Sequence, residues 1–242
     1  MVYTSVNNDK IKNIKRLNNR KYRDESGLFL VEGEHLVREA YNKGYLRELI
    51  LKDGISFDVS IDTIYVTDKI LKYISSLDSY PCVMGVCVKK KNYLSGNRIV
   101  VLDGVQDPGN LGTIIRSCVA FNVDTLVLSG DTVDLYNPKV IRATQGMLFS
   151  LNIVVVDDLE SMILNLKSGG YKVLSTNVNY GKSLKTIEKC DRFVIIMGNE
   201  GRGVSNVLSS LCDDYLYIDM NNNCESLNVA VATSIILYEL DR

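Results

Sequence analysis

Two hydrophobic patterns alternate along residues 98–242. Continuous runs of β-branched and aliphatic residues, typical of strands covered on both faces, are separated by stretches with helical spacing of apolar residues. The predicted strands are 98–103, 125–130, 152–157, 171–176, 193–198 and 215–219. The predicted helices are 111–122, 137–147, 158–168, 204–211 and 226–241. This alternation predicts an α/β fold: a mostly parallel sheet with helices on both faces and right-handed crossovers.

The pattern before residue 89 predicts a smaller α/β unit. Its expected elements are helices at about 8–18, 35–44 and 68–77, and strands at 28–33, 46–51, 63–66 and 83–88. The polar segment KKKNYLSGN (89–97) then separates two apolar runs, as linkers between domains often do. We therefore expect a first domain over 1–88, a linker over 89–97 and a second domain over 98–242.

The composition excludes several classes of protein. Of the 242 residues, 46% are hydrophobic and 24% are charged, which is typical of a globular chain. The absence of a long apolar run or signal-peptide core predicts a cytoplasmic protein without membrane contact. The six cysteines form no Cys-x-x-Cys pair and His35 is the single histidine, so we expect free thiols and no metal site. One histidine also disfavours serine- or cysteine-hydrolase chemistry.

Basic residues cluster near the N-terminus. Residues 1–97 carry 16 basic and 12 acidic residues, a net charge of +4, whereas residues 98–242 carry 12 and 17, a net charge of −5. Such a cluster favours contact with nucleic-acid phosphates, although by itself it is equally typical of a solvated amphipathic helix. The candidate nucleic-acid-binding residues are Lys12, Lys15, Arg16, Arg20, Lys21 and Arg23.

Unusual polar segments follow two of the predicted strands, and ligands of open parallel sheets bind beyond the carboxyl ends of strands. In LDGVQDPGNLGTIIRS (102–117) we expect Asn110 to cap the next helix, with Arg116 nearly two turns into it. MGNEGRGVS (197–205) is glycine-rich but matches neither the dinucleotide nor the P-loop fingerprint. The carboxylate of Glu200 indicates a ligand with positive or hydrogen-bonding groups.

A third polar segment, IDMNNNCESLNVAVA (218–232), follows the last predicted strand. Ser226 or Glu225 is expected to cap the final helix, and asparagines 221–223 tolerate positive φ. Each of the three segments alone could be an ordinary turn, and Arg116 could be a surface arginine. Their gathering at one sheet edge favours a ligand site.

Together these segments resemble the SpoU (TrmH-type) family of S-adenosylmethionine-dependent RNA 2′-O-ribose methyltransferases, in the SPOUT class. The family motif Asn-x-Gly-x-x-x-Arg matches Asn110, Gly112 and Arg116, and Gly-Asn-Glu-Gly-x-Gly matches 198–203. The third motif, Ile-Pro-Met-x-Gly-x-x-x-Ser-Leu-Asn-Val, matches Ile218, Met220, Ser226, Leu227, Asn228 and Val229. Asp219 and Asn222 replace its usual Pro and Gly. We expect Asn222 to preserve the loop shape and the charge of Asp219 to change cofactor affinity, with neither abolishing binding. Residues 1–88 resemble, more loosely, the ribosomal-protein-like substrate-binding domain often found in front.

The resemblance implies a deep C-terminal trefoil knot that holds S-adenosylmethionine, and a homodimer formed through the knotted domain. It assigns cofactor binding to Gly198, Asn199, Gly201, Ile218, Met220 and Leu227. It assigns catalytic roles to Arg116, Asn110, Glu200, Ser226 and Asn228. Because a guanidinium is always protonated, we expect Arg116 to stabilise the forming alkoxide rather than to act as a base, with the other four residues orienting it and the ribose.

The implied function is methylation of a ribose 2′-hydroxyl in 23S ribosomal RNA, favoured over transfer RNA by family analogy. One alternative is a transfer RNA 2′-O-methyltransferase. A catalytically silent RNA-binding ribosome assembly factor of the same fold would bind the cofactor without transferring its methyl group. A nucleotide-dependent oxidoreductase on a doubly wound sheet would fail to bind S-adenosylmethionine.

Overall fold

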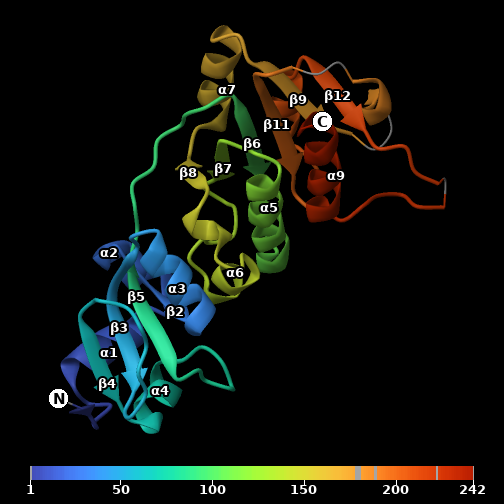
Figure 1. The fold of residues 1–242 in the computed structure, drawn as a ribbon. Coiled ribbons are helices and arrows are strands. Elements are labelled where there is room, and N and C mark those ends of the chain that lie inside the picture. The colour runs from blue at the N-terminus through green and yellow to red at the C-terminus, as the bar shows by residue number, and fades with distance from the viewer. Residues whose placement is uncertain (1, 178–180, 188–189, 222, 242) are drawn as a thin grey trace. The chain divides into compact units, whose positions relative to one another are not determined.

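The computed structural model describes residues 2–177, 181–187, 190–221 and 223–241. The chain forms two compact units (Figure 1). The N-terminal unit comprises Met1–Lys91 together with Asp134–Ser150, and the C-terminal unit comprises Asn92–Val133 and Leu151–Arg242. The segment Asp134–Ser150, which the sequence pattern assigned to the second domain, therefore belongs to the N-terminal unit.

The N-terminal unit is built on a mixed five-stranded sheet in the order β1-β4-β3-β5-β2. Its strands are β1 (Val2–Tyr3), β2 (Leu28–Glu32), β3 (Leu46–Lys52), β4 (Thr63–Val66) and β5 (Val83–Val88). Its helices are α1 (Asp9–Arg16), α2 (Arg20–Ser26), α3 (Glu34–Asn42), α4 (Asp68–Ile74) and α6 (Pro138–Ala143), with the 3₁₀ turn η1 (Met147–Phe149). Helix α1 lies within the predicted helix 8–18, whereas α2 was not predicted; Asn19 caps it by accepting a hydrogen bond from the backbone N–H of Lys21.

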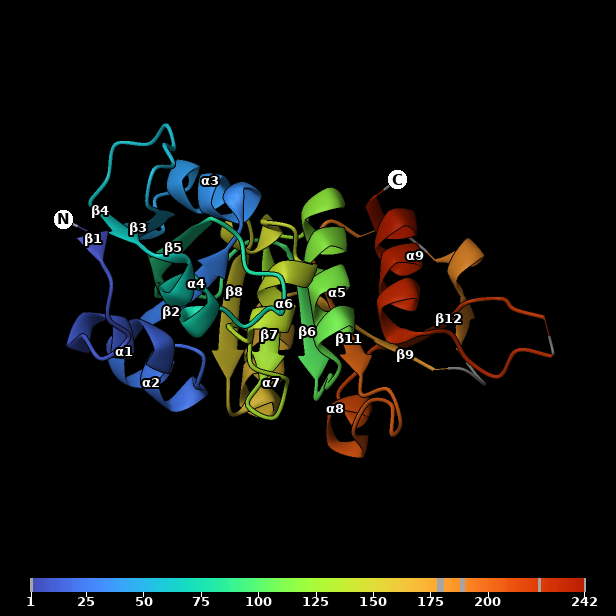
Figure 2. The ribbon, with the colours of Figure 1, turned by 90° about the horizontal axis from the view of Figure 1, so that it is seen from below.

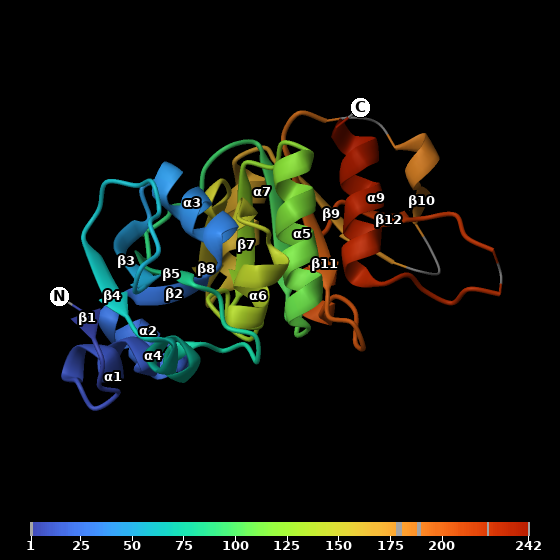
Figure 3. The ribbon, with the colours of Figure 1, turned by 60° about the horizontal axis from the view of Figure 1, so that its bottom comes forward.

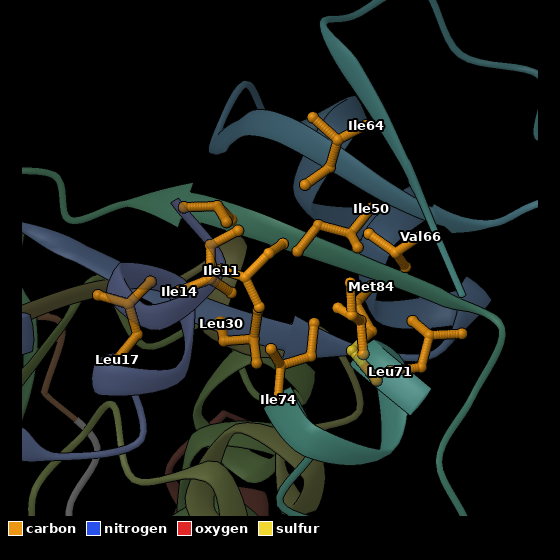
Figure 4. Close-up of a cluster of buried hydrophobic side chains, with 12 residues drawn as sticks. Ile11, Ile14, Leu17, Leu30, Ile50, Ile64, Val66, Leu71, Ile74 and Met84 are labelled. Atoms are coloured by element: carbon orange, nitrogen blue, oxygen red, sulfur yellow. The ribbon is translucent and has the colours of Figure 1, made fainter. Parts of the chain in front are cut away.

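A hydrophobic cluster fills the space between one face of this sheet and helices α1 and α4 (Figure 4). The helices contribute apolar residues three or four positions apart, and the strands contribute alternate residues, as both periodicities require. The buried members are Ile11, Ile14, Leu17, Leu30, Ile50, Ile64, Val66, Ile70, Leu71, Ile74, Met84 and Val86. Each such side chain stabilises the fold by about 1.5–3 kcal/mol relative to an exposed one.

Aromatic contacts and an ion pair hold Asp134–Ser150 in the N-terminal unit. The ring of Phe29 on β2 lies 4.6 Å from that of Tyr136 and 6.4 Å from that of Phe149, centroid to centroid. Arg23 of α2 is only 3% exposed and pairs with the carboxylate of Asp134. These partners are more than 100 residues apart in the chain, so local sequence patterns could not identify them.

The C-terminal unit contains a seven-stranded sheet in the order β10-β12-β9-β11-β6-β7-β8. Each neighbouring pair of its strands is parallel. The strands are β6 (Arg98–Asp103), β7 (Thr125–Ser129), β8 (Asn152–Val156), β9 (Lys172–Thr176), β10 (Lys182–Ser183), β11 (Phe193–Gly198) and β12 (Asp214–Tyr217). The helices are α5 (Pro108–Ala120), α7 (Leu159–Ser168), α8 (Asn206–Ser210) and α9 (Val229–Asp241), with the 3₁₀ turn η2 (Leu184–Thr186).

Helices cover both faces of this parallel sheet, as predicted. Buried residues of α7 and α8 pack against alternate residues of β6, β7, β9 and β11. Helices α5 and α9 lie side by side (Figures 2 and 3) and are joined by a hydrogen bond of 2.7 Å between the hydroxyls of Ser117 and Ser234. Among the helices of the described residues, none combines the length and apolarity that a membrane crossing requires.

The buried cluster predicts the effect of shortening one of its side chains. Ile11→Ala should reduce the free energy of unfolding by about 2–5 kcal/mol, because it leaves a cavity between α1 and the sheet. Urea denaturation followed by circular dichroism measures this loss. Ile55→Ala, the same change at an exposed position, is the control. Equal stability of the two variants would contradict the packing described here.

Candidate active site

The carboxyl ends of the central strands β6 and β11 lie next to each other in parallel register, with Gly198 opposite Asp103. The loops that follow these strands are therefore neighbours. The side chain of Asn199 donates a hydrogen bond of 2.7 Å to the carbonyl of Gly104. The backbone N–H of Ser205 donates one of 2.7 Å to the carboxylate of Asp103. Two of the three polar segments singled out in the sequence thus meet at one sheet edge.

The glycine-rich loop after β11 folds back on itself. The backbone groups of Asn199 and Gly203 exchange two hydrogen bonds, of 3.0 and 2.9 Å. A Cβ atom at Gly198 would lie 2.1 Å from the carbonyl carbon of Gly203, so no side chain fits there. Gly203 has a φ of +70°, and a Cβ atom there would meet nothing within 4 Å. The loop therefore presents bare backbone beside open space, a shape that suits a ligand held by backbone contacts.

Glu200 connects this loop to the start of α5. One carboxylate oxygen accepts hydrogen bonds from the side chain of Asn110 (3.0 Å) and the backbone of Asp107 (3.1 Å). The other accepts from the backbone of Gln106 (3.2 Å). Partial burial raises the pKa of Glu200, but these hydrogen bonds outweigh it, so the pKa lies below its ordinary value of 4.5. The carboxylate is therefore ionised at neutral pH.

Asn110 is a connector rather than the predicted helix cap. Helix α5 begins at Pro108, and its cap is Asp107, whose side chain accepts a hydrogen bond of 2.8 Å from the backbone of Asn110. The freed amide of Asn110 donates to Glu200, and its oxygen accepts a hydrogen bond of 2.9 Å from the side chain of Asn228. The side chains of Glu200, Asn110 and Asn228 thus join all three predicted motifs in one network.

The cap of the last helix is also different from the predicted one. Neither Ser226 nor Glu225 caps it; the side-chain oxygen of Asn228 accepts hydrogen bonds from the backbone of Ala230 (2.9 Å) and Val231 (3.3 Å). Helix α9 begins at Val229 for this reason. Asn228 therefore fixes the start of α9 and its connection to α5 with a single side chain.

Arg116 lies on the exposed side of α5, about 9 Å along the helix axis from Asn110 at 1.5 Å per residue. Among the residues that the structure describes, it has no hydrogen-bond or ion-pair partner. Its guanidinium is therefore available to an incoming anion, whereas the network residues are engaged with one another.

The segment that carries the remaining predicted site residues runs as an extended loop between β12 and α9 (Figures 1 and 2). Ile218, Met220 and Leu227 are partly buried and Ser226 is exposed. Within the described part of the chain, no hydrogen bond links 218–227 to the glycine loop that contains Gly198, Asn199 and Gly201. The structure thus assembles the Glu200–Asn110–Asn228 network but does not join this loop to it by hydrogen bonds.

Asp219, which replaces the proline of the family motif, is held by the segment before β11. Its carboxylate accepts a hydrogen bond from the hydroxyl of Ser183 and lies 3.5 Å from the ammonium of Lys185. The Ser183 hydrogen bond, aided by Lys185, lowers the pKa of Asp219 below its ordinary value. The added charge is therefore compensated locally. Asn222, the second departure from the motif, lies outside the described residues.

Sequence reasoning missed an ion pair between the loops after β7 and β11. Arg202 donates a hydrogen bond of 2.8 Å to Asp131, which follows β7, and Ser129 donates to the same carboxylate. The Ser129 hydrogen bond and Arg202 lower the pKa of Asp131 despite partial burial. Asp131 could have been found, because it follows a predicted strand end. The described residues include no group of His, Cys, Asp or Glu side chains arranged to hold a metal ion.

The six candidate RNA-binding residues occupy different environments. Lys12, Lys15 and Arg16 lie on α1, and Arg20 and Lys21 are exposed on α2. Arg23 is a correction: it is buried against Asp134 and the carbonyl of Leu17, so it cannot contact phosphates. A cluster of basic residues in the sequence does not reveal that Arg23 has a buried acidic partner, Asp134.

Comparison with known proteins identifies the family. Residues 97–238 match the model of the SpoU rRNA Methylase family. The chain belongs to the SpoU rRNA methylase family. Residues 8–84 match the MRM3-like substrate binding domain. The prediction of an RNA 2′-O-ribose methyltransferase that uses S-adenosylmethionine is thereby confirmed for this SpoU methylase.

Three relatives illustrate the similarity along the whole chain. The 23S rRNA (guanosine(2553)-2′-O)-methyltransferase RlmP of Bacillus subtilis is 35% identical, over 98% of this chain and 97% of that protein. An S-adenosylmethionine-bound rRNA methyltransferase from Sinorhizobium meliloti is 30% identical, with a TM-score of 0.87 over 99% and 97% of the two chains. The SpoU methyltransferase AviRb from Streptomyces viridochromogenes, in complex with the same cofactor, is 27% identical, with a TM-score of 0.86 over 97% of each chain.

The network of this SpoU methylase predicts a pH-dependent stability. Glu200→Gln should lower the thermal unfolding midpoint, because one carboxylate oxygen becomes an NH2 group that faces a hydrogen-bond donor, and the negative charge is lost. Since the folded-state pKa of Glu200 is lowered, its stabilisation is present above the ordinary 4.5 and is lost as the pH falls through the folded-state value. The midpoint difference from wild type should therefore be constant from pH 7 to about 5 and shrink at lower pH. Thermal unfolding followed by circular dichroism, from pH 7 down to about pH 3.5, measures the difference in midpoint.

The matched control is Glu225→Gln, which removes an exposed carboxylate from the loop before α9. Its unfolding midpoint should follow that of the wild type at each pH. A midpoint difference for Glu200→Gln that is unchanged at low pH would show that the ionised carboxylate does not stabilise the network.

Proposed function

We propose that this SpoU methylase methylates a ribose 2′-hydroxyl in 23S ribosomal RNA. The observation that carries the reaction is the Glu200–Asn110–Asn228 network, which joins the three motifs at the start of α5, the helix that carries Arg116. The guanidinium of Arg116 has no partner among the described residues. The whole-chain similarity to RlmP, whose name specifies 23S rRNA, supports the ribosomal substrate. A ribosomal substrate also supports a cytoplasmic location.

Arg116 provides the charge that the reaction requires. S-adenosylmethionine, when bound, supplies an electrophilic methyl group on a sulfonium. The receiving hydroxyl must lose its proton and must be held in line with that group. Arg116 cannot act as a base at neutral pH, but its fixed positive charge stabilises the 2′-oxygen as negative charge develops and contacts the neighbouring phosphate. Asn110, Glu200 and Asn228 hold the starts of α5 and α9 together, and Ser226 contacts the ribose.

The open glycine loop fits the cofactor. Backbone groups of Gly198, Asn199 and Gly201 bind the adenosyl group in this proposal, and the open space at Gly203 gives a ligand access to the loop. The ionised Glu200 adds negative charge at the edge where a sulfonium and an amino group are to be held. Ile218, Met220 and Leu227 supply the apolar surface of the pocket.

The C-terminal segment forms a trefoil knot in this proposal. The segment before β11 lies against two elements that come after it: β10 pairs in parallel with β12, and η2 packs against α9. Residues before β11 therefore lie between β12 and α9, which follow β11 in the sequence. This arrangement supports a C-terminal segment that passes through the loop before β11. The loop 218–228 then forms the wall of the cofactor pocket.

A second copy of the chain covers α9. This helix is apolar around most of its circumference, and such helices are normally buried. In one chain, however, Val231 and Tyr238 on α9 are 46% and 49% exposed. Burial of these side chains against a partner subunit supports the homodimer through the methyltransferase domain.

Removal of the Arg116 guanidinium tests its role. Arg116→Ala should reduce methyl transfer by about 100-fold or more, as expected for the loss of one stabilising donor to a developing oxyanion. The assay is tritiated methyl transfer from S-adenosylmethionine to unmodified 23S rRNA, with cofactor affinity measured by calorimetry. Arg192→Ala is the matched control, because Arg192 precedes β11 at the opposite sheet edge and stacks on Tyr171 at 4.4 Å.

Two outcomes separate the alternatives. Transfer to ribosomal RNA that is lost in Arg116→Ala, with cofactor binding retained, supports the proposed enzyme. Cofactor binding by the wild type without transfer to ribosomal or transfer RNA identifies the silent assembly factor.

Disruption of the apolar α9 surface tests the homodimer. The wild type should sediment at twice the chain mass of 27.1 kDa, and Val231→Lys should shift it towards the single-chain mass, because a buried ammonium at the interface is costly. Analytical ultracentrifugation measures both. Val207→Lys, at an exposed valine of α8, should leave the dimer intact. A monomeric wild type would refute this part of the proposal.

A further inference from the structure

The basic residues on α2 are poorly placed for RNA. Arg20 lies 3.6 Å from the carboxylate of Asp24, and Lys21 lies 3.9 Å from that of Glu25. Arg23 is buried in its pair with Asp134. The positive charge that the sequence attributes to this helix is thus mostly balanced by acidic neighbours or withdrawn from solvent.

Helix α4, which the charge pattern did not single out, extends the basic surface of α1. The two helices pack side by side on the same face of the sheet, because both bury their apolar residues in one cluster (Figure 4). On α4 the exposed side carries Lys69 and Lys72, neither of which has a partner among the described residues. The acid on this helix, Asp68, is engaged by Lys52 at 2.8 Å.

An exposed aromatic ring lies among these cations. Tyr73 of α4 is 37% exposed, although the neighbouring Leu71 and Ile74 are fully buried. The ammonium of Lys15 on α1 lies 5.5 Å from the centroid of the Tyr73 ring, within cation–π range. A basic surface with an aromatic ring at its centre is the combination that proteins use to bind unpaired nucleotides: cations contact phosphates, and the ring stacks on a base.

We propose that α1 and α4 form the surface that binds single-stranded RNA. This α1–α4 surface consists of Lys15, Arg16, Lys69, Lys72 and Tyr73, whereas Lys12 lies 3.9 Å from the carboxylate of Asp9 and is left out of it. Its cations contact the phosphates, and one unpaired base stacks on Tyr73. The inference rests on the proposed function in its choice of RNA as the partner, and it deepens that function by specifying single-stranded RNA and a set of residues. Duplex RNA does not use Tyr73, since its bases are already stacked on one another.

The test measures fluorescence anisotropy of the full-length protein with two probes, a labelled oligouridine of about 20 nucleotides and an RNA duplex of similar length. Tyr73→Leu should weaken binding of the single strand about 5- to 140-fold, the equivalent of one lost base stack, and leave duplex binding unchanged. Tyr73→Phe retains the ring and should bind as the wild type does. This second variant separates stacking from any effect on folding.

The double variant Lys69→Gln/Lys72→Gln tests the phosphate contacts. Single-strand binding should weaken, and the slope of log K against log salt should become shallower by about 1.4, or about 0.7 for each lost contact. The matched control is Lys43→Gln/Arg47→Gln, which removes the same charge from exposed positions after α3 and on β3. The control should change neither the salt slope nor the preference for the single strand.

The outcomes distinguish this inference from the proposed function. If Tyr73→Leu binds both probes as Tyr73→Phe does, and Lys69→Gln/Lys72→Gln binds them as Lys43→Gln/Arg47→Gln does, the α1–α4 surface does not bind RNA, whatever the methylation assay shows. If these variants lose single-strand binding but the wild type transfers no methyl group, the surface stands and the proposed reaction fails. Equal weakening of single-strand and duplex binding by Tyr73→Leu would overturn the stacking role.

Discussion

The organisation of the site depends on the carboxylate of Glu200. Three donors converge on it, two from the backbone before α5 and one from Asn110, and none of them has another protein partner among the described residues. Because the amide nitrogen of Asn110 is committed to Glu200, its oxygen must face an incoming donor, which is the side chain of Asn228. A single ionised group thereby sets the orientation of two asparagines and joins three distant segments.

This network links the fold to the chemistry through the two helices that it starts. Asn228 both caps α9 and binds Asn110, so the packing of α9 against α5 begins at the site itself. Arg116 lies on the same rigid helix as Asn110, so the backbone position from which its side chain extends is fixed. The network thus fixes the helix that carries Arg116, a cation without a partner among the residues that the structure describes.

The hydrophobic pattern alone was sufficient to predict the parallel strands, because buried strands such as β6 and β11 are continuous apolar runs. It could not choose between neighbouring cap residues: Asp107 and Asn110, or Ser226 and Asn228, are equally good acceptors, and tertiary contacts decide between them. Motif matching identified the three segments that the Glu200–Asn110–Asn228 network joins, but not the Asp131–Arg202 pair, since the motif leaves position 202 open. Composition could not reveal that Arg23 is buried, because its partner is 111 residues away.

The assignment of Asp134–Ser150 to the N-terminal unit has a consequence for biosynthesis. When the ribosome has synthesised only the first 91 residues, Phe29 lacks its aromatic neighbours and Arg23 lacks its counterion. The N-terminal unit can complete its packing only after the chain has passed through β6 and β7. The two units are therefore interleaved along the chain, and a gene cut at the linker would leave the N-terminal unit without Asp134–Ser150.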